Sequence, residues 1–250
     1  MKLSELKDIY QYQDFYIVGA GPSVNLFPLD FLQGKICISL NDTYKMHPAV
    51  RPIGIMNNPT YAYTGHRRAP YHERFSQIRY PVVKMTGRHR SSKNIDWDHP
   101  DFYCYDWSHN IDTDMFQMTK DTDCLYSTPG GSILHEALQL AWIMGAANIF
   151  VIGCDSRTMG GRHYADFDKD GFSADEDPKG ATRKERNYDS YVYGNLLVIE
   201  FLKSKGVRVF NLSNIVGYHL VDYQFEILKG TRPFATLFDE VRKLRKWDLH

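Results

Sequence analysis

The segment from Ser127 to Asp155 constrains the fold of this chain more than any other stretch. Gly130 and Gly131 form a turn, and the residues from 149 to 152 predict a buried strand that delivers Asp155 beyond its carboxyl end. In an open α/β sheet this edge faces the ligand crevice. The start of a helix offers unpaired backbone N–H groups to an anion. The segment therefore predicts a phosphate or carboxylate bound near Asp155. The helix between turn and strand is predicted from apolar residues at helical spacing, with Gly145 as its end: Ile133, Leu134, Ala137, Leu138, Ala141 and Trp142.

Short apolar runs elsewhere predict further strands. The run over residues 15–18 ends in the turn Gly19 to Ser23, as in the first unit of a nucleotide-binding fold. A helix over 191–205, capped by Gly206, precedes the last predicted strand. Residues 87–126 show little periodicity and predict an irregular region. The other predicted strands cover residues 36–40, 53–56, 81–85 and 207–212.

Strands that alternate with helices predict an α/β fold, Rossmann-like, with a mostly parallel sheet and helices on both faces. We expect a single domain over residues 1–250. Residues 156–185 are rich in Gly, Asp, Lys and Arg and predict a loop or lid-like insertion. The C-terminal segment 230–250 predicts a helix with an apolar face, which suits a second copy of the chain as well as the sheet.

Composition narrows the class of partners. Lys plus Arg number 30 and Asp plus Glu also number 30, so net charge does not point to nucleic acid. The charged start predicts no signal peptide, and no apolar run reaches the length of a membrane span. The four cysteines are far apart, without a CxxC pair, and are expected to be reduced. A cytoplasmic protein is predicted, with any membrane association peripheral.

The turn Gly19 to Ser23 departs from the known phosphate-binding motifs. It lacks the third glycine of the dinucleotide fingerprint and the Gly-Lys-Ser/Thr of a P-loop. Its glycines still allow a ligand to approach the backbone, and Ser23 offers a hydroxyl. The alternative is a tight turn without a ligand.

Polar side chains follow two predicted strands. Asn41 and Asp42 come after the strand over 36–40, and Asn57 and Asn58 after the one over 53–56. Amide and carboxylate groups at this edge suit a base, a ribose or a sugar hydroxyl. For any one of them, a role in forming the turn is an equal alternative.

Beyond Asp155 the chain carries a cluster of reactive groups. Arg157 and Arg162 are suited to a phosphate, and His163 to proton transfer near neutral pH. A solvated loop that happens to carry a histidine is the alternative. Residues 166–177 partly match a calcium loop, but Asp177 replaces the bidentate glutamate. A solvated acidic loop is the better interpretation, so no metal site is predicted.

The glycine turn, together with the segment from Gly130 to Asp155, resembles the MptE-like family, which includes 6-hydroxymethylpterin diphosphokinases and the central domain of Maf flagellin glycosyltransferases. The order of these motifs is also similar to that of the family 42 bacterial sialyltransferases, which use CMP-activated sugars. The resemblance implies that Asn41 and Asn58 hold the nucleotide. It also implies that the nucleotide phosphates and the rest of the pocket are lined by Gly19, Gly21, Pro22, Ser23, Thr128, Gly130, Gly131 and Ser132.

The chain departs from the sialyltransferase pattern after Asp155. Arg157 stands where those enzymes place a catalytic tyrosine, and their catalytic histidine has no match, His163 being the nearest substitute. The first hypothesis is a glycosyltransferase with a CMP-type donor and a glycan or protein acceptor, using Asp155, Arg157 and His163. The second is a diphosphokinase that uses ATP and Mg²⁺. The third is a nucleotide-binding module without catalysis.

Overall fold

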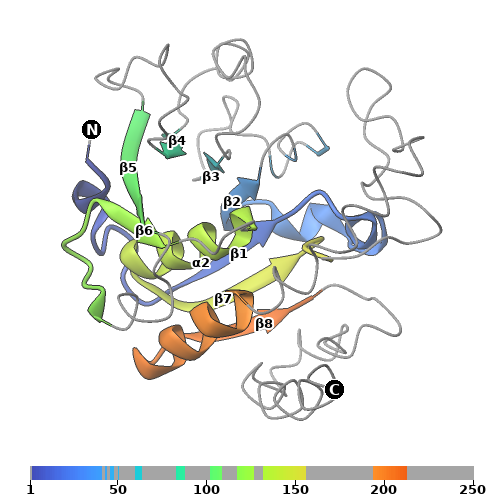
Figure 1. Cartoon of the computed structure of the whole chain (residues 1–250). Coiled ribbons are helices and arrows are strands. Elements are labelled where there is room, and N and C mark those ends of the chain that lie inside the picture. The colour runs from blue at the N-terminus through green and yellow to red at the C-terminus, as the bar shows by residue number, and fades with distance from the viewer. Residues whose placement is uncertain are drawn as a thin grey trace, which may run out of the picture.

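The structure is a computed structural model of the whole chain (Figure 1). It describes residues 2–40, 43, 46–47, 50, 117–126, 132–155 and 194–212. It also describes the backbone of three strands, over residues 60–63, 83–87 and 102–108. The side chains of Pro22 and Leu26 are outside this description.

The described part of the chain builds one eight-stranded sheet in the order β6-β5-β4-β3-β2-β1-β7-β8, and every neighbouring pair is parallel. From β1 the chain moves outward strand by strand to β6 and then returns to the other side of β1 as β7. The order therefore reverses between β1 and β7. The strands are β1 Gln13–Val18, β2 Ile36–Leu40, β3 Thr60–Tyr63, β4 Val83–Gly87, β5 Phe102–Ser108, β6 Cys124–Tyr126, β7 Ala146–Ile152 and β8 Arg208–Asn211.

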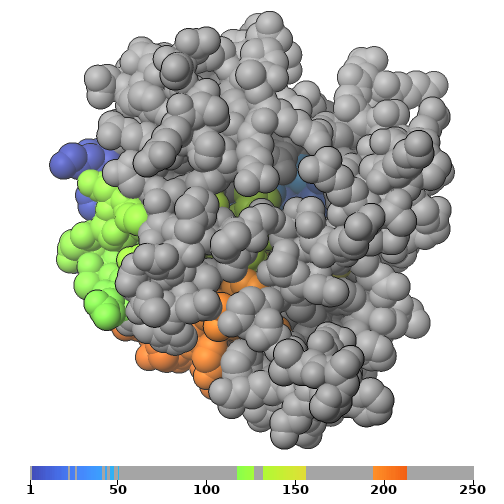
Figure 2. Space-filling model, viewed as in Figure 1, coloured from blue at the N-terminus to red at the C-terminus, as the bar shows by residue number. Residues whose placement is uncertain are grey.

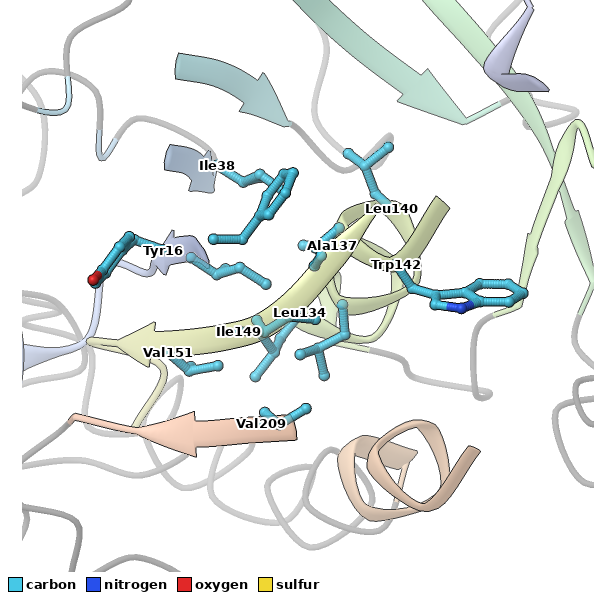
Figure 3. Close-up of a cluster of buried hydrophobic side chains, with 14 of the residues drawn as sticks. Tyr16, Ile38, Leu134, Ala137, Leu140, Trp142, Ile149, Val151 and Val209 are labelled. Atoms are coloured by element: carbon cyan, nitrogen blue, oxygen red, sulfur yellow. The ribbon is translucent and has the colours of Figure 1, made fainter. Parts of the chain in front are cut away.

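The return from β6 to β7 is made by helix α2, Ile133–Ile143. Ser132 caps its start, and Gly145 ends it with a φ of +105°, a conformation that favours glycine. Figure 3 shows Leu134 and Ala137 of α2 beside Ile149 of the sheet. Side chains alternate between the two faces of a strand, so Ile149 and the residues two positions apart from it lie on one face of β7. That face of the sheet is buried under α2.

A second helix, described over residues 194–204, lies on the same side as α2. The ring of its Phe201 meets Trp142 edge to face, with 5.0 Å between the centroids. Residue 206 follows it as a glycine with a φ of +79°. In the described residues, no helix is long and apolar enough to cross a membrane.

The opposite face of the sheet carries a row of stacked aromatic rings. Tyr16 of β1, Phe150 of β7 and Phe210 of β8 lie side by side, with centroids 5.0 and 5.1 Å apart. Phe31 belongs to the short helix η3, Leu29–Leu32, and meets Tyr16 edge to face at 5.8 Å. The connection from β1 to β2, which also contains η2 (Pro22–Leu26), therefore covers the face opposite α2. Helical elements on both faces of a parallel sheet confirm the predicted α/β Rossmann-like fold.

The N-terminal residues close the far end of α2. Residues 8, 10 and 12 donate their backbone N–H groups, over 2.8 Å each, to the carbonyls of residues 143, 144 and 145. The chain reaches this position with positive φ at two residues that are not glycine, Asp8 (56°) and Tyr12 (62°). The side chain of Tyr12 is 84% exposed. The last carbonyls of α2, which a helix cannot satisfy itself, thus gain partners from another segment.

The same segment is bound to the residues before β6. It begins with η1, Leu3–Leu6, whose Ser4 donates its N–H and O–H to Asp123. Lys7 pairs with Asp121 at 2.6 Å. Figure 2 shows the N-terminal residues in blue against residues 117–126 in green at one margin of the molecule. The first strand is thereby attached at its amino end to the far side of the sheet.

Most predicted elements are confirmed where the structure describes them. The helix over 133–143 and the strands over 15–18, 36–40, 81–85, 149–152 and 207–212 are all present, with ends shifted by up to three residues. The irregular region predicted for 87–126 is wrong, because it contains β5 and β6. Strand β3 was not predicted. The predicted strand over 53–56, the insertion 156–185 and the tail helix 230–250 lie outside the described residues.

Candidate functional site

The reversal of strand order brings together the two loops that follow β1 and β7. The pairing of these strands continues beyond their ends, because Gly19 donates its N–H to the carbonyl of Ile152 at 2.7 Å. Gly21 then donates to the carbonyl of Gly153 at 2.6 Å. Ligands of open α/β sheets bind in the crevice at this reversal. The two loops therefore form the floor of the candidate site.

The glycines allow the two backbones to touch. A Cβ atom on Gly19 would lie 2.5 Å from the carbonyl oxygen of Gly153, and one on Gly21 would lie 2.6 Å from the carboxyl of Asp155. Gly153 has a φ of +65°, and its Cβ would lie 2.6 Å from the carbonyl oxygen of Gly19. Real Cβ atoms do not come this close. Loop contact is therefore sufficient reason for glycine at all three positions.

Asp155 and Ser23 form a buried pair between the loops. The Ser23 N–H donates to Oδ2 of Asp155 at 2.8 Å, and its hydroxyl donates to Oδ1 in a short hydrogen bond. The two residues are 3% and 2% exposed. A buried carboxylate needs such donors, because desolvation of its charge is costly. The pair joins the two halves of the sheet across 132 positions of sequence.

The thiol beside this pair is inert. Burial, followed by the charge of Asp155, raises the pKa of Cys154 far above its usual value, so the thiol stays protonated at neutral pH. Its Sγ would lie 2.5 Å from a Cβ on Gly19, so it fills the space between the loops. Burial also raises the pKa of Cys37 in β2 to about 12. Neither thiol is suited to act as a nucleophile.

Helix α2 begins at the carboxyl edge of the sheet, since it follows β6 directly in the parallel array. The hydroxyl oxygen of Ser132 accepts from the Leu134 N–H at 3.2 Å, which is an N-cap. His135 and Glu136 in the first turn are buried, at 0% and 3% exposed. Burial raises the pKa of Glu136 well above its usual value.

The structure describes six of the residues predicted for the site. Gly19, Gly21, Ser23 and Asp155 are brought together at the ends of β1 and β7, and Ser132 caps α2. Pro22 continues the first loop as the first residue of η2. The other predicted residues lie outside the described part of the chain: Asn41, Asn58, Thr128, Gly130, Gly131, Arg157 and His163. In the described part no group of three or more His, Cys, Asp and Glu side chains could hold a metal ion.

Sequence reasoning missed the buried polar residues of α2. Glu136 and Gln139 interrupt a helix whose other buried positions are mostly apolar, and they stand three residues apart. Positions three apart share a helix face, so the pair was visible in the sequence as a polar stripe. The prediction considered only the apolar stripe.

The strand order reverses between β1 and β7, and a glycine loop follows each of these two strands. This arrangement defines an open, doubly wound α/β fold of Rossmann type. No protein-family model matches the chain, and no curated protein is similar to it. Among solved structures, it is similar to the crystal structure of an alanine variant of the sialyltransferase CST-II in complex with CMP. The TM-score is 0.47 and the identity 15%, over 80% of this chain and 81% of that one.

Proposed function

We propose that this protein is a nucleotide-dependent transferase, and more specifically a glycosyltransferase with a CMP-type sugar donor. One observation carries the proposal. The glycine loops after β1 and β7 are joined by backbone hydrogen bonds at the reversal of strand order, which is where this fold class binds its ligands. The order of motifs along the chain, which resembles that of nucleotide-binding families, supports a nucleotide as the ligand.

In this proposal the reaction is a displacement at the anomeric carbon of the sugar. A hydroxyl oxygen of the glycan or protein acceptor forms the new bond, and the bond from carbon to the phosphate oxygen breaks. The departing nucleotide keeps the electron pair. Arg157 and the N–H groups at the start of α2 stabilise its phosphate. His163 takes the proton of the acceptor.

Asp155 has a different role from the one expected of a catalytic acid. Both of its carboxylate oxygens accept hydrogen bonds from Ser23 in a buried position. We therefore assign Asp155 the role of positioning the first glycine loop. His163 is the residue that transfers the proton.

Isothermal titration calorimetry with CMP, UDP, GDP and ATP, each with and without Mg²⁺, tests the proposal. CMP should bind without Mg²⁺, and the His163→Ala variant should bind it equally while losing turnover. Absence of binding by every nucleotide would refute the proposal. Binding of ATP alone, with AMP released when a hydroxymethylpterin and Mg²⁺ are added, would favour the diphosphokinase hypothesis instead.

A further inference from the structure

The loop after β1, from Gly19 to Val24, uses its backbone N–H groups within the protein. Gly19 and Gly21 donate to carbonyls of the opposite strand and loop, at 2.7 and 2.6 Å. Ser23 donates to a carboxylate of the loop after β7 at 2.8 Å, and Val24 donates to the carbonyl of Gly21 at 3.1 Å. The residue at position 22 is a proline, which has no N–H. In this loop, at most the N–H of Ala20 is left for a ligand.

The carboxylate that Ser23 binds belongs to Asp155 and lies against the loop. One of its oxygens accepts the Ser23 N–H, and the other accepts the Ser23 hydroxyl. A Cβ atom on Gly21 would lie 2.6 Å from the carboxyl carbon of Asp155 and 2.6 Å from its Oδ2. Backbone N–H groups at a glycine loop are the donors that phosphate-binding proteins offer to their ligands. Here these donors hold an anionic group of the protein itself.

A phosphate group at this loop would have to displace the carboxylate or approach it. Displacement would take the Ser23 donors away from a carboxylate that is 3% exposed, and a buried charge without its donors is costly. Approach from the crevice would bring two negative charges together across Gly21, which has no side chain to separate them. Both routes disfavour a phosphate at this loop.

We infer that Asp155 is a specificity-determining residue, which fills the anion site of the first glycine loop and thereby excludes phosphate groups from it. This inference rests on the proposed function and deepens it, because it limits the class of donor. The part of the donor that lies over this loop is uncharged, such as its ribose or base. A donor with a single phosphate meets this condition, and a second phosphate should add nothing to the affinity.

The Asp155→Ala variant tests the inference, because it empties the anion site and frees both donors of Ser23. Formate, a free carboxylate, should then bind there and stabilise the folded state. In urea denaturation, formate in place of chloride at equal ionic strength should raise the ratio of folded to unfolded Asp155→Ala about tenfold.

The matched control is Asp123→Ala, because Asp123 accepts the N–H and the hydroxyl of Ser4 in the same way, beside the amino end of β6. Formate should change the ratio of folded to unfolded protein by less than about twofold in this variant and in the parent protein. Equal responses of the two variants would overturn the inference.

The second measurement compares CMP with CDP, which differ by one phosphate, by calorimetry. The parent protein should bind the two within about threefold of each other, and the Asp155→Asn variant should shift this ratio toward CDP about tenfold. Asparagine keeps the shape of the side chain and an acceptor for the Ser23 N–H, and it removes the charge.

The outcomes separate the inference from the proposed function. If the ratio of the two affinities is the same in Asp155→Asn and in the parent protein, the inference fails and the proposed function stands. If the parent protein binds no nucleotide while formate stabilises Asp155→Ala as expected, the proposed function fails, and the occupied anion site stands.

Discussion

Replacing Gly153 by alanine should destabilise the protein in two separable ways. The residue has a φ of +65°, which costs an alanine about 1–2 kcal/mol. Its new Cβ would also lie 2.6 Å from the carbonyl oxygen of Gly19 and 2.8 Å from Cβ of Val24. Both neighbours are rigid, because one is backbone and the other is the Cβ of a buried side chain. Overpacking of this kind costs about 1–3 kcal/mol more.

Gly206 provides the matched control. Its φ of +79° is similar, and a Cβ at this position would meet nothing within 4 Å. The Gly206→Ala variant should therefore show the conformational cost alone. The difference between the two variants, expected at about 1–3 kcal/mol, isolates the contact between the loops.

The free energy of unfolding of both variants is measured by urea denaturation, provided that the slope of the transition is unchanged. The Gly153→Ala variant should have the lower midpoint of the two. An equal loss of unfolding free energy in the two variants would show that close contact between the loops after β1 and β7 is not required. The argument for the candidate site, which rests on that contact, would then be refuted.

Two further changes test the helix and the N-terminal segment. Burial raises the pKa of Glu136 above its usual 4.5, so the native state keeps a proton that the unfolded chain releases as pH rises, and stability falls with pH in that window. The Glu136→Gln variant should lose less stability between pH 5 and 7, by up to about 1.4 kcal/mol per pH unit in urea denaturation, and parallel profiles would contradict the burial of this carboxyl. Tyr12 has a φ of 62° and is 84% exposed, so Tyr12→Asn should relieve strain without losing packing. The urea midpoint should rise by the equivalent of about 0.5–1 kcal/mol, and a lower midpoint would show that the tyrosine ring contributes to stability.

The centre of the fold could be predicted from sequence because its signals are local. The apolar spacing and the stop at Gly145 define α2 within a dozen residues, and the strand that follows is a continuous apolar run. Strand β5 was missed although Tyr103, Tyr105 and Trp107 alternate along it, a pattern of period two that was available. Strand β6 has only three residues, and its last backbone groups are paired by Gln139, thirteen positions away.

The site could be predicted only in part, because its central contact is not local. The sequence placed Ser23 and Asp155 at strand ends on the same edge of the sheet. It could not show that the two are bonded to each other, since 132 positions separate them and nothing in either motif specifies the partner. The sequence analysis explained the glycines by the close approach of a ligand. In the structure, glycine is already needed because the two loop backbones lie in contact.

The pairing of β1 with β7 has a consequence for the order in which the molecule forms. During synthesis one edge of β1 can pair with β2 early, but the other edge stays open until β7 has left the ribosome. At about 5–20 residues per second, the 132 positions between Ser23 and Asp155 take roughly 7–26 s to make. An open, apolar strand edge during that time can pair with other chains. The crevice is thus completed late in synthesis, after the central strand β1 has spent this time with one of its two edges unpaired.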